Sequence, residues 1–438
     1  MKDVRYFPLF FCLLAGSALA DGKGGAAGER LDKVEKESEA LKDEIRKLKL
    51  DVAVPKAEYK SYGGLGPAAS KVYYVPRGFS IGGYGEVTYE HFGAASKTNK
   101  ADVVRFVPYL GYKFNDRIVM NAELEVEHAG IGNVGDRKPE VYVEFAYLDF
   151  LIHQAFSIRA GLILMPASSM NEFHEPTVYN GVLRPDVERL IIPSVWREIG
   201  LMLHGRFDFG LSYKLALTSG LRTDTIKDWI KDGRQRGAEI NFDRFAAIAR
   251  LDYSFKDIVK VGGFAYYGEG EDKAGGAENG TQIGYFALFG GEAQFDWKNI
   301  WLKGAVAFGS AAGNNAYQTE PGKNRSKEVY GGYVEAAYNL MPLFSPETVM
   351  SLSPFVRYEK YNLQSAVFNG NTADAAKDRT VLTFGLGFKP HPQVVIKADY
   401  QLRDTASTLA EGLGKDAAGN SRDGDKVDQF NVGVGFIF

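Results

Sequence analysis

Charged and apolar side chains alternate along many stretches of this chain. In the stretch 394–403, apolar residues occupy every second position, and the positions between them hold Lys397, Asp399, Gln401 and Arg403. Because successive side chains of a β-strand point to opposite faces, all four polar groups would share one face. A strand face that carries both signs of charge is suited to contact with ions and polar solutes.

Residue patterns typical of catalysis or metal binding do not stand out. The six histidines are scattered, without the HExxH spacing of a zinc protease, and there is no Walker-type glycine loop. Cys12 is the single cysteine and lies in an apolar N-terminal run, so zinc–thiolate sites are excluded from the rest of the chain. The acidic stretch 416–428 lacks EF-hand spacing. We therefore predict no catalytic residue, no metal site and no cofactor, and a protein that is not an enzyme.

The alternating pattern recurs in sixteen segments of about ten to fifteen residues. They begin near residues 79, 101, 117, 138, 155, 195, 207, 241, 257, 281, 299, 327, 350, 378, 392 and 427. The connections between them alternate strictly between tight turns and long polar loops, which is typical of outer-membrane barrels. The sequence thus predicts an all-β fold: a 16-stranded antiparallel transmembrane β-barrel over residues 78–438, preceded by a short N-terminal coiled-coil helix.

Alternation also assigns the two faces of the predicted barrel. In the last segment Phe430, Val432, Val434 and Phe436 share one face, which suits lipid, and the opposite face suits water. Aromatic residues near both strand ends, Tyr266 and Tyr361 among them, predict belts at the two membrane interfaces. The residues assigned to the pore lining are Arg105, Glu123, Glu125, Glu127, Glu144, Arg159, Lys214, Arg244, Arg250, Lys303, Arg357, Lys397 and Arg403.

Two interpretations fit these lumenal charges. Glu123, Glu125 and Glu127 lie on one strand next to Glu144, whereas Arg244 and Arg250 lie several strands away. Opposite signs on opposite walls would create a field across the pore and filter ions modestly. Alternatively, these residues form interior salt bridges between neighbouring strands, and selectivity comes from pore width alone.

The longest loop, residues 166–194, is the candidate for a constriction. If it folds into the barrel, its charged residues narrow the pore; if it folds outside, they do not. The predicted constriction residues are Glu172, His174, Glu175, Arg184, Asp186 and Arg189.

The N-terminal residues have a different composition. Residues 1–20 predict a signal peptide, since Lys2 and Arg5 precede an apolar run that ends in a small-x-small site, Ala18 to Ala20. Residues 21–54 predict a periplasmic coiled-coil helix, because apolar residues within 28–54 recur three and four positions apart. A lone amphipathic helix fits the same spacing. Pro55 would end the helix, and residues 55–77 predict a linker.

Together these stretches resemble the phosphate-selective porin O and P family. The resemblance is carried by the N-terminal coiled coil, the first strand FSIGGYGEVTY, the strand ending in Phe438, and the stretch AGLILMPASSMNEFHEPTVYNGVLRPDVERLIIPSVWREIGLMLHG. It covers about residues 78–438 and implies a trimer of 16-stranded barrels whose third outer loop folds inward. In that family, phosphate selectivity is attributed to a run of lumenal arginines and a cluster of lysines, which this sequence does not match residue by residue.

The resulting hypothesis is a bacterial outer-membrane porin for passive diffusion of ions and small hydrophilic solutes, with anions such as phosphate among them. Expected partners are outer-membrane lipid, two further copies of the chain, and the solutes. With 52 basic and 55 acidic residues, the chain has no excess of basic charge for nucleic acid. The alternative is a structural role, in which the periplasmic coiled coil ties the membrane to the cell wall. An outer-membrane hydrolase would need a nucleophile and a base at the barrel rim, and no such pair stands out.

Overall fold

The structure is a computed structural model that describes residues 33–44, 60–94, 97–130, 140–272, 281–368, 371–411 and 422–438. The chain divides into two units, Met1–Lys56 and Ala57–Phe438. In the first unit, residues 33–44 form a helix whose side chains are all exposed. The predicted signal peptide and the remainder of the predicted coiled coil lie outside the described residues. Among the described residues, no helix combines the length and the apolar character needed to cross a membrane.

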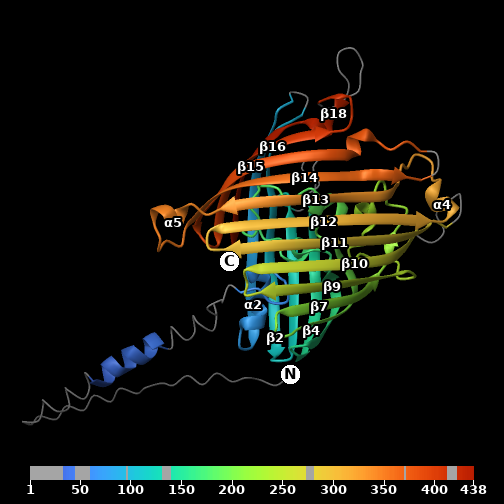
Figure 1. Ribbon diagram of the computed structural model, residues 1–438. Coiled ribbons are helices and arrows are strands. Elements are labelled where there is room, and N and C mark those ends of the chain that lie inside the picture. Colours follow the sequence, from blue (N-terminus) through green and yellow to red (C-terminus); the bar gives the residue numbers. More distant parts are fainter. Residues whose placement is uncertain are drawn as a thin grey trace, which may run out of the picture. The chain divides into compact units, whose positions relative to one another are not determined.

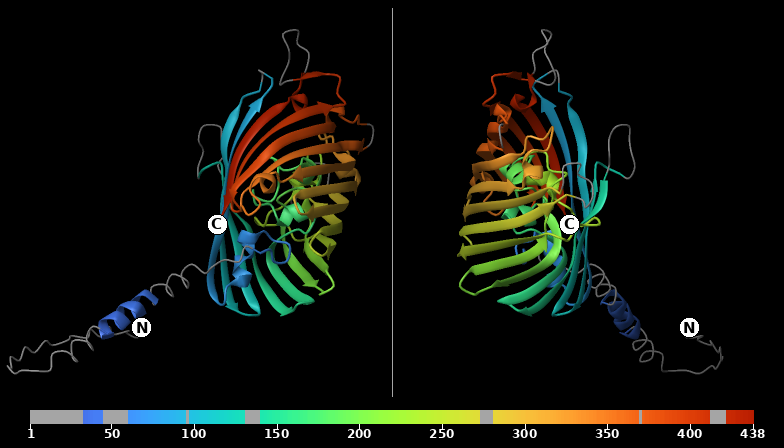
Figure 2. Two further views of the ribbon diagram at one scale, coloured as in Figure 1. Left: turned by 60° about the vertical axis from the view of Figure 1, so that its left-hand side comes forward. Right: turned by 90° about the vertical axis from the view of Figure 1, so that its right-hand side faces the viewer.

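The second unit is a closed antiparallel β-barrel (Figures 1 and 2). Strand β1 pairs with β2 on one side and with the last strand, β19, on the other, which closes the sheet. In the described part of the chain the barrel has sixteen long strands: β1(Gly78–Phe92), β2(Lys100–Asn115), β3(Ile118–Glu127), β4(Glu140–His153), β5(Phe156–Leu164), β6(Arg197–Arg206), β7(Leu211–Ser219), β9(Phe245–Phe255), β10(Val259–Glu271), β11(Ile283–Trp297), β12(Ile300–Gly313), β13(Ser326–Tyr338), β14(Ser351–Val367), β15(Asp378–His391), β16(Val394–Thr405) and β19(Gln429–Ile437). The predicted fold class is confirmed, and each predicted strand start lies within four residues of the observed one.

The shortest connections lie at one end of the barrel and the longest at the other, and 339–350 is a long connection at the end of the short ones. We call the end with connections such as 116–117, 154–155 and 298–299 the turn side, and the opposite end the loop side. The smaller elements lie in the connections: β8(Leu221–Arg222), β17(Ala410–Glu411), β18(Arg422–Asp423), α4(Asn315–Gln318), α5(Met341–Phe344), η2(Ile230–Gly233), η3(Ala375–Lys377) and η4(Gly424–Lys426).

The strands keep the predicted alternation of faces. In β9, Phe245 and Leu251 are exposed on the outer surface, whereas Ala246, Ile248 and Arg250 are buried on the inner one. The same alternation repeats around the barrel, so the outer surface presents a continuous band of exposed apolar side chains. Such a band would be unfavourable in water and favourable in hydrocarbon.

Part of the segment predicted to be a linker packs inside the barrel at the turn side. Helix α2(Pro67–Tyr74) begins with proline, which is favoured in the first turn because its missing N–H needs no partner there. Ala68 and Val72 are buried, and the Asn121 side chain of β3 donates from Nδ2 to the Ala69 carbonyl at 2.8 Å. Residues 60–77 therefore contribute to the contents of the lumen, while residues 55–59 lie outside the described part of the chain.

Candidate functional site

The loop between β5 and β6, residues 165–196, lies within the lumen (Figure 2). We call it the inward loop; it includes α3(Ser169–Glu172) and η1(Val187–Ile191). The Tyr179 hydroxyl donates to Glu86 of β1 at 2.6 Å. The Val182 N–H donates to Asp399 of β16 at 2.5 Å. Since both acceptors are buried on the inner face, the structure places this loop inside the barrel rather than outside it.

Three of the six predicted constriction residues, Glu172, Glu175 and Asp186, hold the loop to its surroundings. Glu172, His174, Glu175 and Asp186 are buried, and Arg184 and Arg189 are half-buried. Glu172 forms an ion pair with Lys214 of β7. Glu175 Oε1 accepts hydrogen bonds from the N–H groups of Ala68 at 3.0 Å and Ala69 at 3.3 Å. These donors belong to the first turn of α2, so Glu175 caps that helix from the inward loop.

Asp186 is the most strongly bonded of the six. Its side chain, 4 % exposed, accepts hydrogen bonds from Arg403 at 2.6 Å, Arg189 at 2.6 Å and the Tyr361 hydroxyl at 2.7 Å. Burial alone would raise the pKa of Asp186, but the two guanidinium groups and the Tyr361 hydrogen bond hold it well below its usual range. The Asp186 carboxylate is therefore charged at any ordinary pH and fastens the loop to β14 and β16.

We expect the Asp186→Asn variant to lose about 3 kcal/mol of unfolding free energy at pH 7, because two half-buried cations lose their buried carboxylate. The pKa of Asp186 is lower in the folded state than its unfolded value of about 3.9. The ionised carboxylate therefore stabilises the fold above about pH 4, and this stabilisation is lost as the pH falls below that value. The difference between wild type and variant should accordingly be constant from pH 5 to 8 and shrink below about pH 4. Urea unfolding in lipid vesicles at each pH checks this, and a difference that grows on acidification would contradict it.

The thirteen predicted pore-lining residues are found on or beside the inner face. Arg244 lies just before β9, at the loop side, where it pairs with Glu269 and Glu271 of β10. Glu127, Arg244 and Arg403 are half-buried. The buried ones are Arg105, Glu123, Glu125, Glu144, Arg159, Lys214, Arg250, Lys303, Arg357 and Lys397.

Most of these charges are paired with a close neighbour. Arg357 of β14 lies 3.1 Å from Glu335 of β13 and 2.9 Å from Glu359 on its own strand. Arg159 of β5 lies 2.9 Å from Asp149 of β4. At these positions the geometry favours interior salt bridges between neighbouring strands over two opposed walls of unpaired charge.

A cavity of about 480 Å³ opens at the turn side. Residues 61–64, the start of α3 and the turn-side halves of several strands line it. We call it the vestibule. The basic residues in its lining are Arg206, Lys214, Arg250, Lys260 and Lys303. The acidic residues in its lining are Glu172, Asp252 and Glu292. The lining therefore carries more basic than acidic groups, and Arg206 and Lys260 are exposed.

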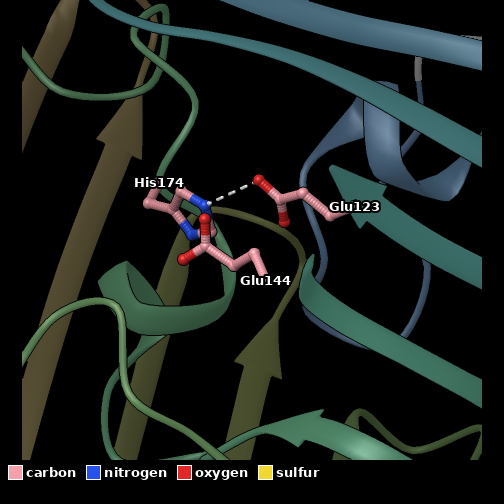
Figure 3. Close-up of side chains that lie close together, drawn as sticks. All are labelled: Glu123, Glu144 and His174. Atoms are coloured by element: carbon pink, nitrogen blue, oxygen red, sulfur yellow. Dashed lines mark ion pairs between the residues drawn. The ribbon is translucent and has the colours of Figure 1, made fainter. Parts of the chain in front are cut away.

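Buried acidic residues of β3 and β4 face His174 of the inward loop (Figure 3). His174 Nε2 lies 3.6 Å from Glu123 Oε1, and Glu144 lies beside both. Burial, together with the nearby Arg105 and Arg184, lowers the pKa of His174 to about 3, so the imidazole is neutral. The Glu144 oxygens and His174 Nε2 have no hydrogen-bond partner among the described residues.

The inner face is less polar than the sequence alone indicates. Tyr266 and Tyr361, predicted to lie in an interfacial belt, are 1 % and 0 % exposed and point into the barrel. Their prediction as belt residues is wrong because Tyr361 shares its strand face with Arg357, and Tyr266 shares its face with Lys260, which lines the lumen. Trp196, Trp229 and Phe286 are buried in the same apolar cluster. The barrel interior thus combines an apolar cluster under the loops with networks of paired charges.

Several residues of these networks were not predicted. Asp149 accepts from the Tyr73 hydroxyl of α2 and pairs with His204 of β6, and Glu86 accepts from Tyr179. Asp149 and Glu86 follow the strand alternation and could have been found by it. Residues 78–82 read Gly-x-Ser-x-Gly, but they form the start of β1 and not the strand-to-helix turn that positions a nucleophilic serine.

Comparison with known proteins identifies relatives in sequence and in fold. No family model matches the chain. A protein of Aquifex aeolicus (strain VF5), described as uncharacterized, is 34% identical over 373 residues, which cover 82% of this chain and 83% of that protein. The chain belongs to the same family as this Aquifex protein.

Solved structures extend the comparison at the level of the fold. A loop-deletion form of the outer membrane protein OmpT of Vibrio cholerae has a TM-score of 0.52 at 12% identity, covering 83% of this chain and 100% of that one. The outer membrane channel DcaP of Acinetobacter baumannii has a TM-score of 0.51 at 11% identity, covering 82% and 97%. OmpF of Salmonella typhi, solved with daunomycin, has a TM-score of 0.50 at 15% identity, covering 83% and 98%. The chain therefore has the fold of a porin-like outer-membrane barrel.

Proposed function

We propose that this chain is a bacterial outer-membrane channel through which ions and small hydrophilic solutes diffuse down their own gradients. The observation that carries the proposal is a closed 16-stranded barrel with an apolar outer surface and charged groups on its inner one. A barrel of this size leaves an aqueous path unless other segments fill it. The inward loop and α2 narrow this path, so the channel has a low conductance for its strand number.

The vestibule supports a modest preference for anions. Five basic and three acidic residues line it. Glu292 pairs with Arg250 and Lys303, Asp252 pairs with Arg250, and Glu172 pairs with Lys214, so the surplus of positive charge comes from Arg206 and Lys260. A surplus of positive charge raises the local concentration of anions, and inorganic phosphate is one solute of this class. The basic surplus of the vestibule attracts anions in general. The vestibule is therefore suited to a general preference for anions over cations.

Replacing an exposed vestibule cation tests this selectivity. In the Lys260→Glu variant the basic surplus disappears, so the reversal potential across a tenfold KCl gradient should move toward that of a cation-preferring pore. Lys327→Glu, an exposed position outside the vestibule lining, is the matched control and should leave the reversal potential unchanged. An identical reversal potential in wild type and Lys260→Glu would exclude the vestibule as the selectivity element.

The helix of residues 33–44 supports a trimer with this helix in the periplasm. Val34 and Leu41 are 61% and 58% exposed. Because they occupy the repeating apolar positions of residues 28–54, a three-stranded coiled coil of neighbouring copies would cover them. Light scattering of the detergent-solubilised chain should give three copies, and fewer after deletion of residues 28–54. Should the deletion leave conductance intact but release the cell wall from the membrane, the segment would instead act as a structural tether.

A further inference from the structure

The acidic group in Figure 3 is short of positive charge. Glu123 and Glu144 are 0 % exposed and Glu125 is 2 % exposed. Two guanidinium groups lie nearby: Arg105, which also pairs with Glu86 at 3.7 Å, and Arg197, which lies 3.7 Å from Glu144. Buried carboxylates without sufficient compensation are costly, so a cation that binds among them would stabilise the folded barrel.

A β-bulge aims Glu144 into this group. In the β3–β4 pairing Glu123 lies opposite Phe145, and the next residue, Leu124, lies opposite Val143, which leaves Glu144 as the extra residue. Glu144 and Phe145 are consequently both buried on the inner face, in a strand whose other side chains alternate. A bulge that redirects one side chain is a feature frequently found beside functional sites.

The imidazole ring of His174 is held in the orientation that is usual for a metal-binding histidine. Its Nδ1 lies 3.0 Å from the Asn171 carbonyl, which can only accept, so Nδ1 carries the proton and Nε2 has a free lone pair. Asn171 is itself fixed, since its Nδ2 donates to the Met165 and Trp196 carbonyls at 2.7 and 2.9 Å. A hydrogen bond from the remote ring nitrogen to a backbone carbonyl is the usual support of a histidine that binds a metal.

The free lone pair of His174 faces carboxylate oxygens, which also carry lone pairs. The separation of 3.6 Å between Nε2 and Glu123 Oε1 is close to that between two ligands of one ion with bonds of about 2.0–2.2 Å. One ligand atom each from Glu123, Glu144 and His174 lie within 4.8 Å of one another. The three side chains would have to draw closer together to coordinate one ion with bonds of about 2.0–2.2 Å.

We propose that Glu123, Glu144 and His174 form a binding site for a divalent transition-metal ion such as Zn²⁺. One imidazole nitrogen with carboxylate oxygens suits Zn²⁺, whereas Mg²⁺ and Ca²⁺ prefer oxygen ligands throughout. Since His174 lies on the inward loop and the two carboxylates on β3 and β4, the ion would fasten the loop to the barrel wall. The proposed site requires only that the barrel and the inward loop are folded. It would therefore bind the ion whether or not the chain conducts ions.

The test uses the full chain in detergent, stripped with a chelator, refolded with Zn²⁺ and dialysed. Wild type should retain one Zn²⁺ per chain, and a competing chromophoric chelator should show that His174→Gln and Glu144→Gln each weaken Zn²⁺ binding at least about 100-fold. Ca²⁺ should not compete. Glu127→Gln, on β3 but outside the triad, and His153→Gln, an exposed histidine, are matched controls that should bind as wild type does.

Wild-type protein alone provides a second test in case a variant fails to fold. X-ray absorption of the bound Zn²⁺ should show a single imidazole nitrogen together with oxygen ligands at about 2.0–2.2 Å. Wild-type chains that retain no Zn²⁺, a His174→Gln variant that binds it equally well, or a Zn²⁺ coordinated by two or more imidazoles would each overturn the proposal.

Discussion

Replacing residues 168–193 with a short Gly/Ser linker is expected to raise the single-channel conductance several-fold. The inward loop leaves the wall between β5 and β6 and contacts Glu335 of β13 and Glu359 of β14, which lie on the opposite side of the closed sheet, so it extends across the lumen. Without it, a barrel of sixteen strands has a wide aqueous interior. Single-channel recording in planar bilayers measures the change directly, and the altered channel should also lose discrimination between small and large ions.

The turn-side connection 339–350 provides the matched control for this replacement. It includes α5, whose Leu343 and Phe344 are 63% and 76% exposed, so it does not fill the lumen. Shortening it should leave the conductance unchanged. If the loop replacement also leaves the conductance unchanged while the barrel still folds, the inward loop does not limit the path.

The second large effect concerns stability. We expect Arg357→Ala to lower the unfolding free energy by about 3–5 kcal/mol, because Glu335 and Glu359 would remain buried without their shared cation. Both carboxylates also hold the inward loop, Glu335 through the Asn180 side chain and Glu359 through the Val187 N–H. Urea unfolding in lipid vesicles measures the loss.

Arg117→Ala is the matched control for this variant, since Arg117 lies exposed in the tight turn between β2 and β3. Its unfolding free energy should stay within about 0.5 kcal/mol of wild type. A loss below about 1 kcal/mol for Arg357→Ala would show that the Arg357 network is solvated and contributes little.

The barrel itself was predictable because lipid and water impose a period of two on every strand. In β9 and β16, for example, apolar and polar residues alternate over 249–255 and 396–403, and the tight turn between β2 and β3 is marked by Asn115 and Asp116. The residues on the inner face followed directly from that alternation. These features depend on local sequence, and they need no knowledge of which strands meet.

The contents of the lumen depend on contacts between distant segments and were harder to predict. Helix α2 lies in residues that read as a Gly/Pro-containing linker, and it is capped by Glu175, about a hundred residues away. Tyr266 and Tyr361 also face inward, but period two already places Tyr361 on the same face as Arg357 and Tyr266 on the same face as Lys260, so this part of the lumen could have been predicted from the sequence.

The proposed metal site has no local signature at all. Glu123, Glu144 and His174 come from two strands and a loop, with none of the short spacings that motifs record. Glu144 reaches the site because of a bulge, and register shifts of this kind are not evident from a period-two pattern. The prediction that the chain has no metal site was based on motif spacing alone. Motif spacing could not have pointed to these three residues, because they lie far apart in the sequence.

The most direct test of the central claim is the current through the wild-type chain in a planar bilayer. A closed barrel with lipid outside and solutes within predicts discrete, ohmic current steps that appear in groups of three when a trimer inserts. A membrane that stays sealed after insertion of the folded chain, and stays sealed when the inward loop is replaced, would contradict it.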